Sequence, residues 1–150
     1  MKKALFFALL LLTLAGCAEA PRTSLRFAIE TAPTNLDPRF ATDATSTRIN
    51  RLLYQRLVDF NDAAEPTPAL ATWQPLNPQH YRFTLPTTAR FADSSPLTSQ
   101  DVKATYDSIL DPKTASPHRT SLEVIQAIKI INDQTVDFVL NYPDPLFPGY

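Results

Sequence analysis

The chain has 150 residues, 44% apolar and 19% charged, and its 14 Lys and Arg residues nearly balance its 15 Asp and Glu residues. This composition is typical of a globular protein, and the balanced charge argues against nucleic-acid binding, which needs a clustered basic excess. Gly16 and Gly149 are the only glycines, so the sequence contains no Gly-rich phosphate loop. One cysteine and two histidines exclude a disulfide framework and a thiolate-rich zinc site. We expect no metal and no cofactor.

The N-terminus has the pattern of a secretory signal. Lys2 and Lys3 supply a positive start, and residues 4–15 form an uncharged, mostly apolar run. A membrane-spanning helix is the alternative, but such a helix needs about 20 apolar residues. Glu19 and Arg22 follow the apolar run too soon for that.

The apolar run ends in Leu14-Ala15-Gly16-Cys17, which resembles the lipobox of bacterial lipoproteins. The resemblance implies that residues 1–16 are a lipoprotein signal peptide and that Cys17 becomes the lipidated first residue. An idle thiol or an intermolecular disulfide is the alternative for Cys17. Residues 17–23 then form a flexible tether. We expect a protein of the cell envelope, lipid-anchored to a membrane on its periplasmic or other extracytoplasmic face.

The pattern of a folded domain begins at Ser24. Residues 24–30 alternate polar and apolar side chains, which is typical of a half-buried strand. The next dozen residues predict a loop, because they contain the turn-forming residues Pro33, Asn35, Asp37 and Pro38.

A helix is predicted from about Thr42 or Asp43. Apolar side chains follow at helical spacing and share one face, at Ile49, Leu52, Leu53 and Leu57. Three arginines lie largely off this face, and we interpret them as a solvated surface in preference to an anion site; they are Arg48, Arg51 and Arg56.

The middle of the chain predicts short strands. Residues 57–60 form a short strand or turn, and residues 66–76 are so rich in proline that we expect a surface crossing, anchored by Leu70 and Trp73. Residues 80–85 alternate as a strand does, and residues 90–92 continue that pattern after a break at Pro86.

A second helix and a hairpin complete the pattern. Thr98 and Asp101 form a capping box at the start of the helix, and Pro112 ends it. Residues 127–131 and 136–140 form a β-hairpin, with residues 122–126 as a helical turn or strand lead-in. Interleaved strands and helices indicate a mixed α/β or α+β fold. No closing element precedes Tyr150, so we expect a truncated chain.

The sequence offers no convincing catalytic site. His80 and His118 are the only histidines that could act as bases, and each is placed as a surface or strand-edge residue. The pair Asp107 and Asp111 lies on the exposed side of a helix, where solvation explains it. We therefore predict that the protein is not an enzyme.

Several stretches, taken in order, resemble the extracytoplasmic solute-binding proteins of the peptide, dipeptide and nickel type, which feed ABC importers. Ser94 and Arg56 stand where that family has glycine, so we expect remodelled turns there, and Pro86 stands where it usually has arginine. The stretches that carry the resemblance are Asn35-Leu36-Asp37-Pro38, residues 53–58, residues 68–73, residues 81–85, residues 91–102 and Asp133-Gln134-Thr135-Val136.

This resemblance implies a two-lobed periplasmic-binding-protein-like fold, of which residues 24–150 are the N-terminal part, with half of the cleft missing. It also implies peptides or similar small solutes, an ABC permease and the membrane as partners, and no nucleic acid. Asn35 and Asp37 are the candidates for contacts with the solute, although a structural turn would also explain them. The alternative function is a structural or cell-wall-associated lipoprotein with the same fold and no transport role.

Overall fold

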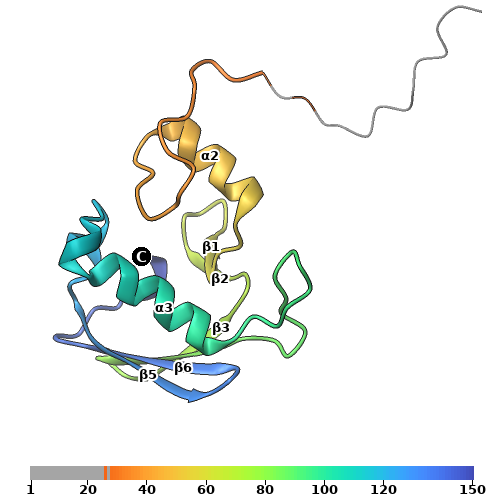
Figure 1. Cartoon of the computed structure of the whole chain (residues 1–150). Helices are drawn as coiled ribbons and strands as arrows, with labels where there is room; N and C mark the ends of the chain where they lie inside the picture. The colour runs from red at the N-terminus through yellow and green to blue at the C-terminus, as the bar shows by residue number, and fades with distance from the viewer. Residues whose placement is uncertain (1–25, 27) are drawn as a thin grey trace, which may run out of the picture. The chain divides into compact units, whose positions relative to one another are not determined.

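The computed structural model describes residue 26 and residues 28–150 (Figure 1). The chain divides into two units, residues 1–30 and residues 31–150, and the helices and strands of the described residues belong to the second. In chain order these elements are α2 (Ala44–Leu53), β1 (Val58–Phe60), β2 (Pro66–Pro68), β3 (Thr72–Asn77), β4 (His80–Thr84), α3 (Ser99–Leu110), the short 3-10 helix η1 (Pro112–Thr114), α4 (Arg119–Leu122), β5 (Ile125–Asn132), β6 (Thr135–Leu140) and the 3-10 helix η2 (Phe147–Gly149).

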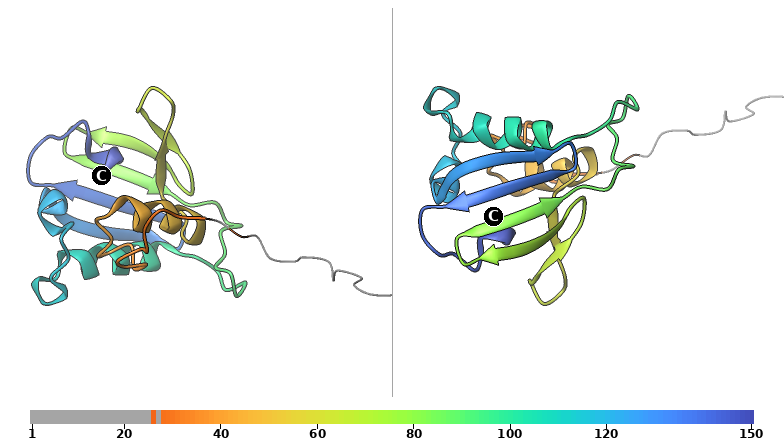
Figure 2. Two further views of the ribbon diagram at one scale, coloured as in Figure 1. Left: turned by 90° about the horizontal axis from the view of Figure 1, so that it is seen from above. Right: turned by 90° about the horizontal axis from the view of Figure 1, so that it is seen from below.

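Four antiparallel strands form the main sheet in the order β3-β4-β6-β5, and β1 and β2 form a separate two-stranded ladder. On β4 and β6, Tyr81 lies opposite Phe138 and Arg82 lies opposite Asp137. Because side chains alternate along a strand, these two pairs point to opposite faces of the sheet. α3 packs on one face, against β5 and β6, while the view from below shows no helix over the other face (Figures 1 and 2).

The apolar core lies between the sheet and the elements on its covered face. Phe138 is fully buried, and its ring lies 4.9 Å from that of Tyr106 on α3 and 5.2 Å from that of Phe83 on β4. Phe147 of η2 closes the core beside β4, 5.4 Å from Phe138 between ring centroids. Aromatic side chains of this size contribute much of the apolar area that stabilises a small domain.

The second predicted helix and the hairpin are confirmed. α3 follows Thr98, whose backbone N–H and hydroxyl both donate to the Asp101 carboxylate at 2.8 Å in a capping box. The helix ends before Pro112, as Pro cannot continue the ladder of hydrogen bonds. β5 and β6 form the predicted hairpin. Of residues 122–126 ahead of it, residue 122 ends α4, 123–124 are a turn and 125–126 already belong to β5.

The helix predicted from Asp43 is confirmed, but its predicted apolar face is wrong. The helix ends at Leu53, so Leu57 lies beyond it, and Leu52 and Leu53 are 67% and 59% exposed. The buried residues are Ser46 and Asn50. Ser46 is buried because its hydroxyl accepts hydrogen bonds from two backbone N–H groups of the preceding loop, which an apolar side chain could not do. Asn50 makes no such bond with the described residues.

The proline-rich residues 66–76 are not a simple crossing, because they contain β2 and most of β3. β3 is an edge strand with an irregularity beside Pro75, and an edge is where proline is tolerated. The anchoring role predicted for Leu70 and Trp73 is confirmed, since both pack against the core.

Residues 90–92 do not form a strand. Arg90 makes only an isolated bridge with Pro96, and the segment between them is a turn. Ser94 has a φ of 71°, so it adopts the left-handed conformation that favours glycine. Arg56 is not among the residues with positive φ, so the substitution expected to strain its turn does not do so.

Of the strand predicted over residues 24–30, residues 24, 25 and 27 lie outside the described residues, and the other four are described and are not in a strand. In the described part of the chain, no helix is long and apolar enough to cross a membrane.

Candidate functional site

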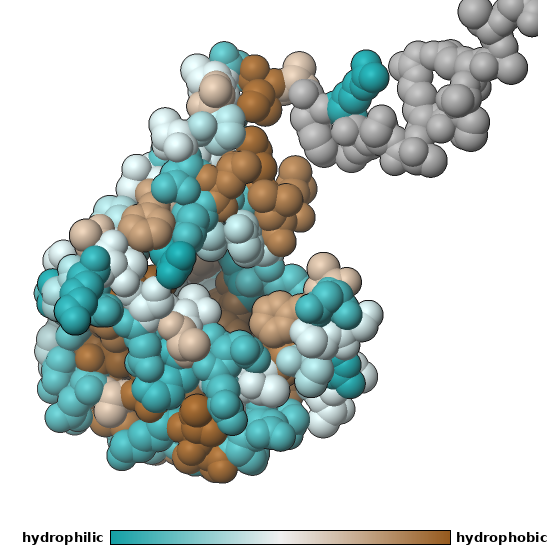
Figure 3. All heavy atoms as spheres, in the orientation of Figure 1, coloured by the Kyte–Doolittle hydropathy of each residue, from teal (hydrophilic) through white to brown (hydrophobic). Residues whose placement is uncertain are grey.

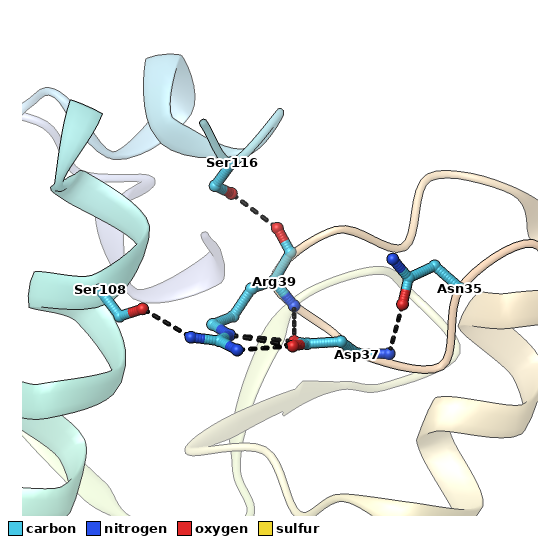
Figure 4. A network of polar contacts seen from close by, with 5 residues as sticks. All are labelled: Asn35, Asp37, Arg39, Ser108 and Ser116. Atoms are coloured by element: carbon cyan, nitrogen blue, oxygen red, sulfur yellow. Dashed lines mark hydrogen bonds and ion pairs between the residues drawn. The ribbon is translucent and has the colours of Figure 1, made fainter. Parts of the chain in front are cut away.

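The loop that carries Asn35 and Asp37 is closed by its own side chains (Figure 4). The side-chain Oδ1 of Asn35 accepts a hydrogen bond from the backbone N–H of Asp37 at 2.9 Å, which is an Asx turn. The Asp37 carboxylate accepts from the backbone N–H of Arg39 at 3.0 Å. The two residues therefore lie side by side in one turn.

Arg39 binds the Asp37 carboxylate with two nitrogen atoms. Its Nε lies 3.0 Å from Oδ1, and one terminal nitrogen lies 2.6 Å from Oδ2. A bidentate pair of this kind is stronger and more directional than a single hydrogen bond. The guanidinium lowers the pKa of Asp37 below its ordinary value, so this carboxylate stays ionised in neutral solution.

The same arginine ties the loop to the body of the domain. Its second terminal nitrogen donates to the Ser108 hydroxyl on α3 at 2.7 Å, and the Ser116 hydroxyl donates to the Arg39 carbonyl at 2.7 Å (Figure 4). The ring of His118 lies 2.9 Å from the carbonyl oxygen of Ala41. The loop is thus fixed at several points along its length.

The start of the loop is held by the first turn of α2. Asp43 caps the helix, where its carboxylate accepts from the backbone N–H of Ser46 at 2.8 Å and from the Thr34 hydroxyl. The fully buried Ser46 hydroxyl accepts from the backbone N–H groups of Thr34 and Asn35, at 3.0 and 3.2 Å. The hydrogen bonds that Asp43 accepts from Ser46 and then from Thr34 lower its pKa. The helix-capping residue Asp43 and the candidate residue Asn35 are therefore joined through Ser46 in one network of hydrogen bonds.

A pocket that the sequence did not predict lies where α2 leads into β1. The Asp59 carboxylate accepts from the backbone N–H of Phe60 at 3.0 Å and from Arg51 at 2.7 Å, while Arg56 lies 3.8 Å from the same oxygen. The Phe60 N–H, followed by Arg51, lowers the pKa of Asp59. The pocket has a volume of about 300 Å³ and is lined by Arg51, Tyr54, Gln55, Arg56, Asp59, Ala69 and Leu70.

The sequence had assigned Arg51 and Arg56 to a solvated surface, and both are indeed about half exposed. Arg56 and Asp59 are three residues apart, but neither lies in a helix, where that spacing would indicate pairing. The pairing of Arg51 with Asp59 arises only because the chain turns after α2. No periodicity in the sequence could have predicted it.

The two histidines hold structural positions. His80 lies 2.9 Å from the Asp137 carboxylate, which Arg82 also binds at 2.7 Å, and the three side chains form a charged cluster on the open face of the sheet. His118 contacts a backbone carbonyl. Within residues 28–150 neither imidazole has a hydroxyl or thiol partner among its hydrogen bonds, and no three potential ligands come together as a metal site.

Two stretches of the chain match models of known protein families. Residues 65–150, which contain the whole main sheet and α3, match the family described as bacterial extracellular solute-binding proteins, family 5 Middle. Residues 1–18 match the prokaryotic membrane lipoprotein lipid attachment site. The second match includes Cys17, which lies outside the described residues. A membrane-anchored, extracytoplasmic location is confirmed.

Among curated proteins, the chain is 34% identical over 103 residues to the periplasmic murein peptide-binding protein MppA of Escherichia coli, covering 68% of this chain and 19% of that protein. It is 27% identical over 143 residues to the oligopeptide-binding protein OppA of Bacillus subtilis, covering 84% of this chain and 26% of that protein. The chain therefore spans about a fifth to a quarter of these relatives.

Among solved structures, the murein tripeptide-binding protein MppA of Escherichia coli superposes with a TM-score of 0.74 at 28% identity, covering 79% of this chain and 27% of that one. The prediction of a mixed α/β fold of the periplasmic-binding-protein type is confirmed.

Proposed function

This chain belongs to the bacterial extracellular solute-binding proteins of family 5, and we propose that it is the lipid-anchored receptor of an ABC importer, which captures peptides or similar small solutes. The observation that carries the proposal is the family match over residues 65–150, together with the fold. The relatives are named for a murein peptide and for oligopeptides. The chain spans only part of the length of these relatives. Its solute and its permease are therefore proposed from the similarity.

In the proposed mechanism, residues 31–150 contribute one wall of a cleft that closes when solute contacts favour the closed state. An extended peptide would be held mainly through its backbone, as in strand addition, with water around its side chains. Recognition of this kind accepts many sequences, because every peptide has the same backbone groups.

We propose Asn35 and Asp37 as the residues of this wall that face the solute. The Asn35 side chain is exposed and uses only its oxygen within the turn, so its NH₂ group can donate to a solute carbonyl. Asp37 is bound by Arg39, but a carboxylate has further acceptor sites. The rigid loop would present both groups without the entropy cost of ordering them on binding.

At the N-terminus, we propose cleavage before Cys17, acylation of its thiol, and a tether of residues 17–23. One acyl chain gives only marginal membrane binding, so a lasting anchor needs several chains on this cysteine. The proposal includes no catalytic step. The two histidines make structural contacts, and the loop of Asn35 and Asp37 is held in place by hydrogen bonds, which is consistent with binding a solute without changing it.

The test of solute capture uses the protein purified from the membranes of cells that express it. Solutes released by denaturation are identified by mass spectrometry, and the stripped protein is titrated with them while its unfolding temperature is recorded. A ligand at 100 times its Kd should stabilise the folded protein by about 2.7 kcal/mol. If no solute is released and no peptide raises the unfolding temperature, the protein is a structural or cell-wall-associated lipoprotein.

The anchor is tested separately by labelling the same cells with radioactive palmitate. The wild-type protein should incorporate the label and stay with the membranes, and the Cys17→Ser variant should do neither. Equal labelling of the two proteins would refute the anchor. Solute binding by Cys17→Ser should equal that of the wild type, which keeps anchoring and capture apart.

A further inference from the structure

The pocket between α2 and β1 has an excess of positive charge. Arg51 and Arg56 share one carboxylate, that of Asp59, so two positive groups face one negative group. An anion that enters the pocket would therefore meet an uncompensated positive field.

We propose that this pocket binds a carboxylate group that is joined to an apolar or aromatic group, as at the C-terminus of a peptide with an apolar last residue. The guanidinium fork matches a carboxylate because its nitrogens can donate two parallel hydrogen bonds to the two oxygens. The residues that carry the proposal are Arg56, Arg51, Tyr54 and Leu70.

Arg56 is the arginine that is available to the ligand. Arg51 lies 2.7 Å from Asp59 and is committed to it, whereas Arg56 is 3.8 Å away, which is an ion pair without a close hydrogen bond. The Asp59 oxygen that they share also accepts the Phe60 N–H, so it is already occupied. A ligand carboxylate can thus engage Arg56 without breaking an existing hydrogen bond of Arg56.

The apolar part of the ligand is expected because polar and apolar groups share the lining. Ala69, Leu70 and Tyr54 line the pocket together with the two arginines. Leu70 is partly buried against the core, which gives this wall a fixed position. The volume of about 300 Å³ suits one terminal residue of a peptide or a small amphipathic acid.

The inference rests on the proposed function only for the source of the carboxylate, since the pocket itself is formed by residues of this chain. A peptide C-terminus and a free carboxylic acid offer the same group. A test with a small acid and its amide therefore measures the chemistry of the pocket, whatever solute the whole protein carries.

The probe is N-acetyl-para-fluorophenylalanine, and its neutral control is the corresponding amide. Binding to the whole chain, purified in detergent, is followed by the broadening of the ligand's fluorine NMR line. The acid should bind with a Kd on the order of 1 mM, as expected for a small ligand at an open site. The amide should bind at least about tenfold more weakly, because it lacks the charge that strengthens a hydrogen bond to arginine.

Three variants locate the site. Arg56→Gln should weaken binding of the acid about tenfold. Arg48→Gln removes the same charge from an exposed position of α2 outside the pocket lining, and should change the Kd by less than about twofold. Asp59→Asn removes the competing carboxylate and should strengthen binding severalfold, a gain that a misfolded variant would not show.

The inference is overturned if the acid does not bind, if the acid and the amide bind equally, or if Arg48→Gln weakens binding as much as Arg56→Gln. None of these results affects the capture of solutes by the membrane-purified protein, which is measured separately. Conversely, a protein that releases no solute from membranes can still bind the acid in this pocket. Failure of the one proposal is therefore distinguishable from failure of the other.

Discussion

The region around α2 and the region around the main sheet bury opposite kinds of side chain. The sheet and α3 enclose Phe138, Val136 and Leu140, each no more than 2% exposed. α2 buries Ser46 and Asn50 and leaves Leu52 and Leu53 in solvent, and apolar surface gathers at the end of this helix (Figure 3). The sheet region is thus stabilised by apolar packing among its own elements, and the α2 region by hydrogen bonds to a loop.

This contrast shows that helical periodicity predicts the existence of a helix better than the face it buries. α3 and α2 both carry apolar residues at helical spacing. α3 finds an apolar sheet beside it, whereas the buried Ser46 of α2 accepts hydrogen bonds from two backbone N–H groups of the loop. A leucine at that position could not pair with them.

Substitution at the centre of the sheet core should have the largest effect on the free energy of unfolding. Phe138→Ala should lower the free energy of unfolding by about 3–5 kcal/mol, because it removes a buried ring and leaves a cavity. Leu52→Ala, the matched control on α2, should lower it by less than about 0.5 kcal/mol because that side chain is mostly exposed. Urea unfolding, followed by the fluorescence of Trp73, measures both.

Equal losses in these two variants would mean that Leu52 is covered in solution and that the contrast between the regions is wrong. If Phe138→Ala does not fold at all, Phe138→Leu gives a graded comparison. That variant keeps an apolar side chain in the core and should cost about 1–2 kcal/mol.

The charged cluster on the open face of the sheet should give the next largest effect. Asp137→Asn should lower the free energy of unfolding by about 1–3 kcal/mol near neutral pH, because the buried carboxylate binds Arg82 at 2.7 Å and His80 at 2.9 Å. Asp62→Asn, in an exposed turn, is the control and should change little.

The same variant should reveal a pH dependence. Arg82, and to a smaller extent His80, lower the pKa of Asp137 in the folded protein. Its contribution to stability is complete above the unfolded pKa of about 4 and is lost as the pH falls through the lower folded pKa. The difference between wild type and Asp137→Asn should therefore shrink below about pH 4. A difference that stays constant down to pH values of about 2 would contradict the ionic role of Asp137.

The N-cap of α2 should show a smaller effect that is specific to the loop. Asp43→Ala should lower the free energy of unfolding by about 1–2 kcal/mol, because Asp43 caps the helix and also holds Thr34. Thr98→Ala at the start of α3 should cost about 1 kcal/mol. Hydrogen exchange should quicken at Thr34 and Asn35 only in Asp43→Ala. Faster exchange of these amides in both variants would mean that the loop is not held by α2.

The smallest effect on the free energy of unfolding is expected from substitution of Asn50. The side-chain nitrogen and oxygen of Asn50 are buried and make no hydrogen bond with any described residue. Asn50→Leu should therefore leave the free energy of unfolding within about 0.5 kcal/mol of the wild type or raise it, since an unpaired buried amide is itself unfavourable. A loss above about 1 kcal/mol would mean that Asn50 has a partner, such as a buried water.

Local signals in the sequence predicted much of the fold correctly. The capping box of Thr98 and Asp101, the start of α2 at Asp43 and the turn of the β5–β6 hairpin depend on residues within four positions of one another. The role of Asn35 and Asp37 as solute contacts stays a prediction. Asn35 and Asp37 do lie together, but the arginine that binds Asp37 reaches Ser108, which is 69 positions away in the chain.

The sequence by itself determined the lipid-attachment signal, the class of the fold and the family, because each is written in short motifs whose order along the chain is enough to identify them. Only the tertiary structure decided which face of α2 is buried, which strand could carry Pro75, and which arginines share Asp59. These features depend on which groups meet across the fold, where unpaired hydrogen-bonding groups and edge positions outweigh local preference.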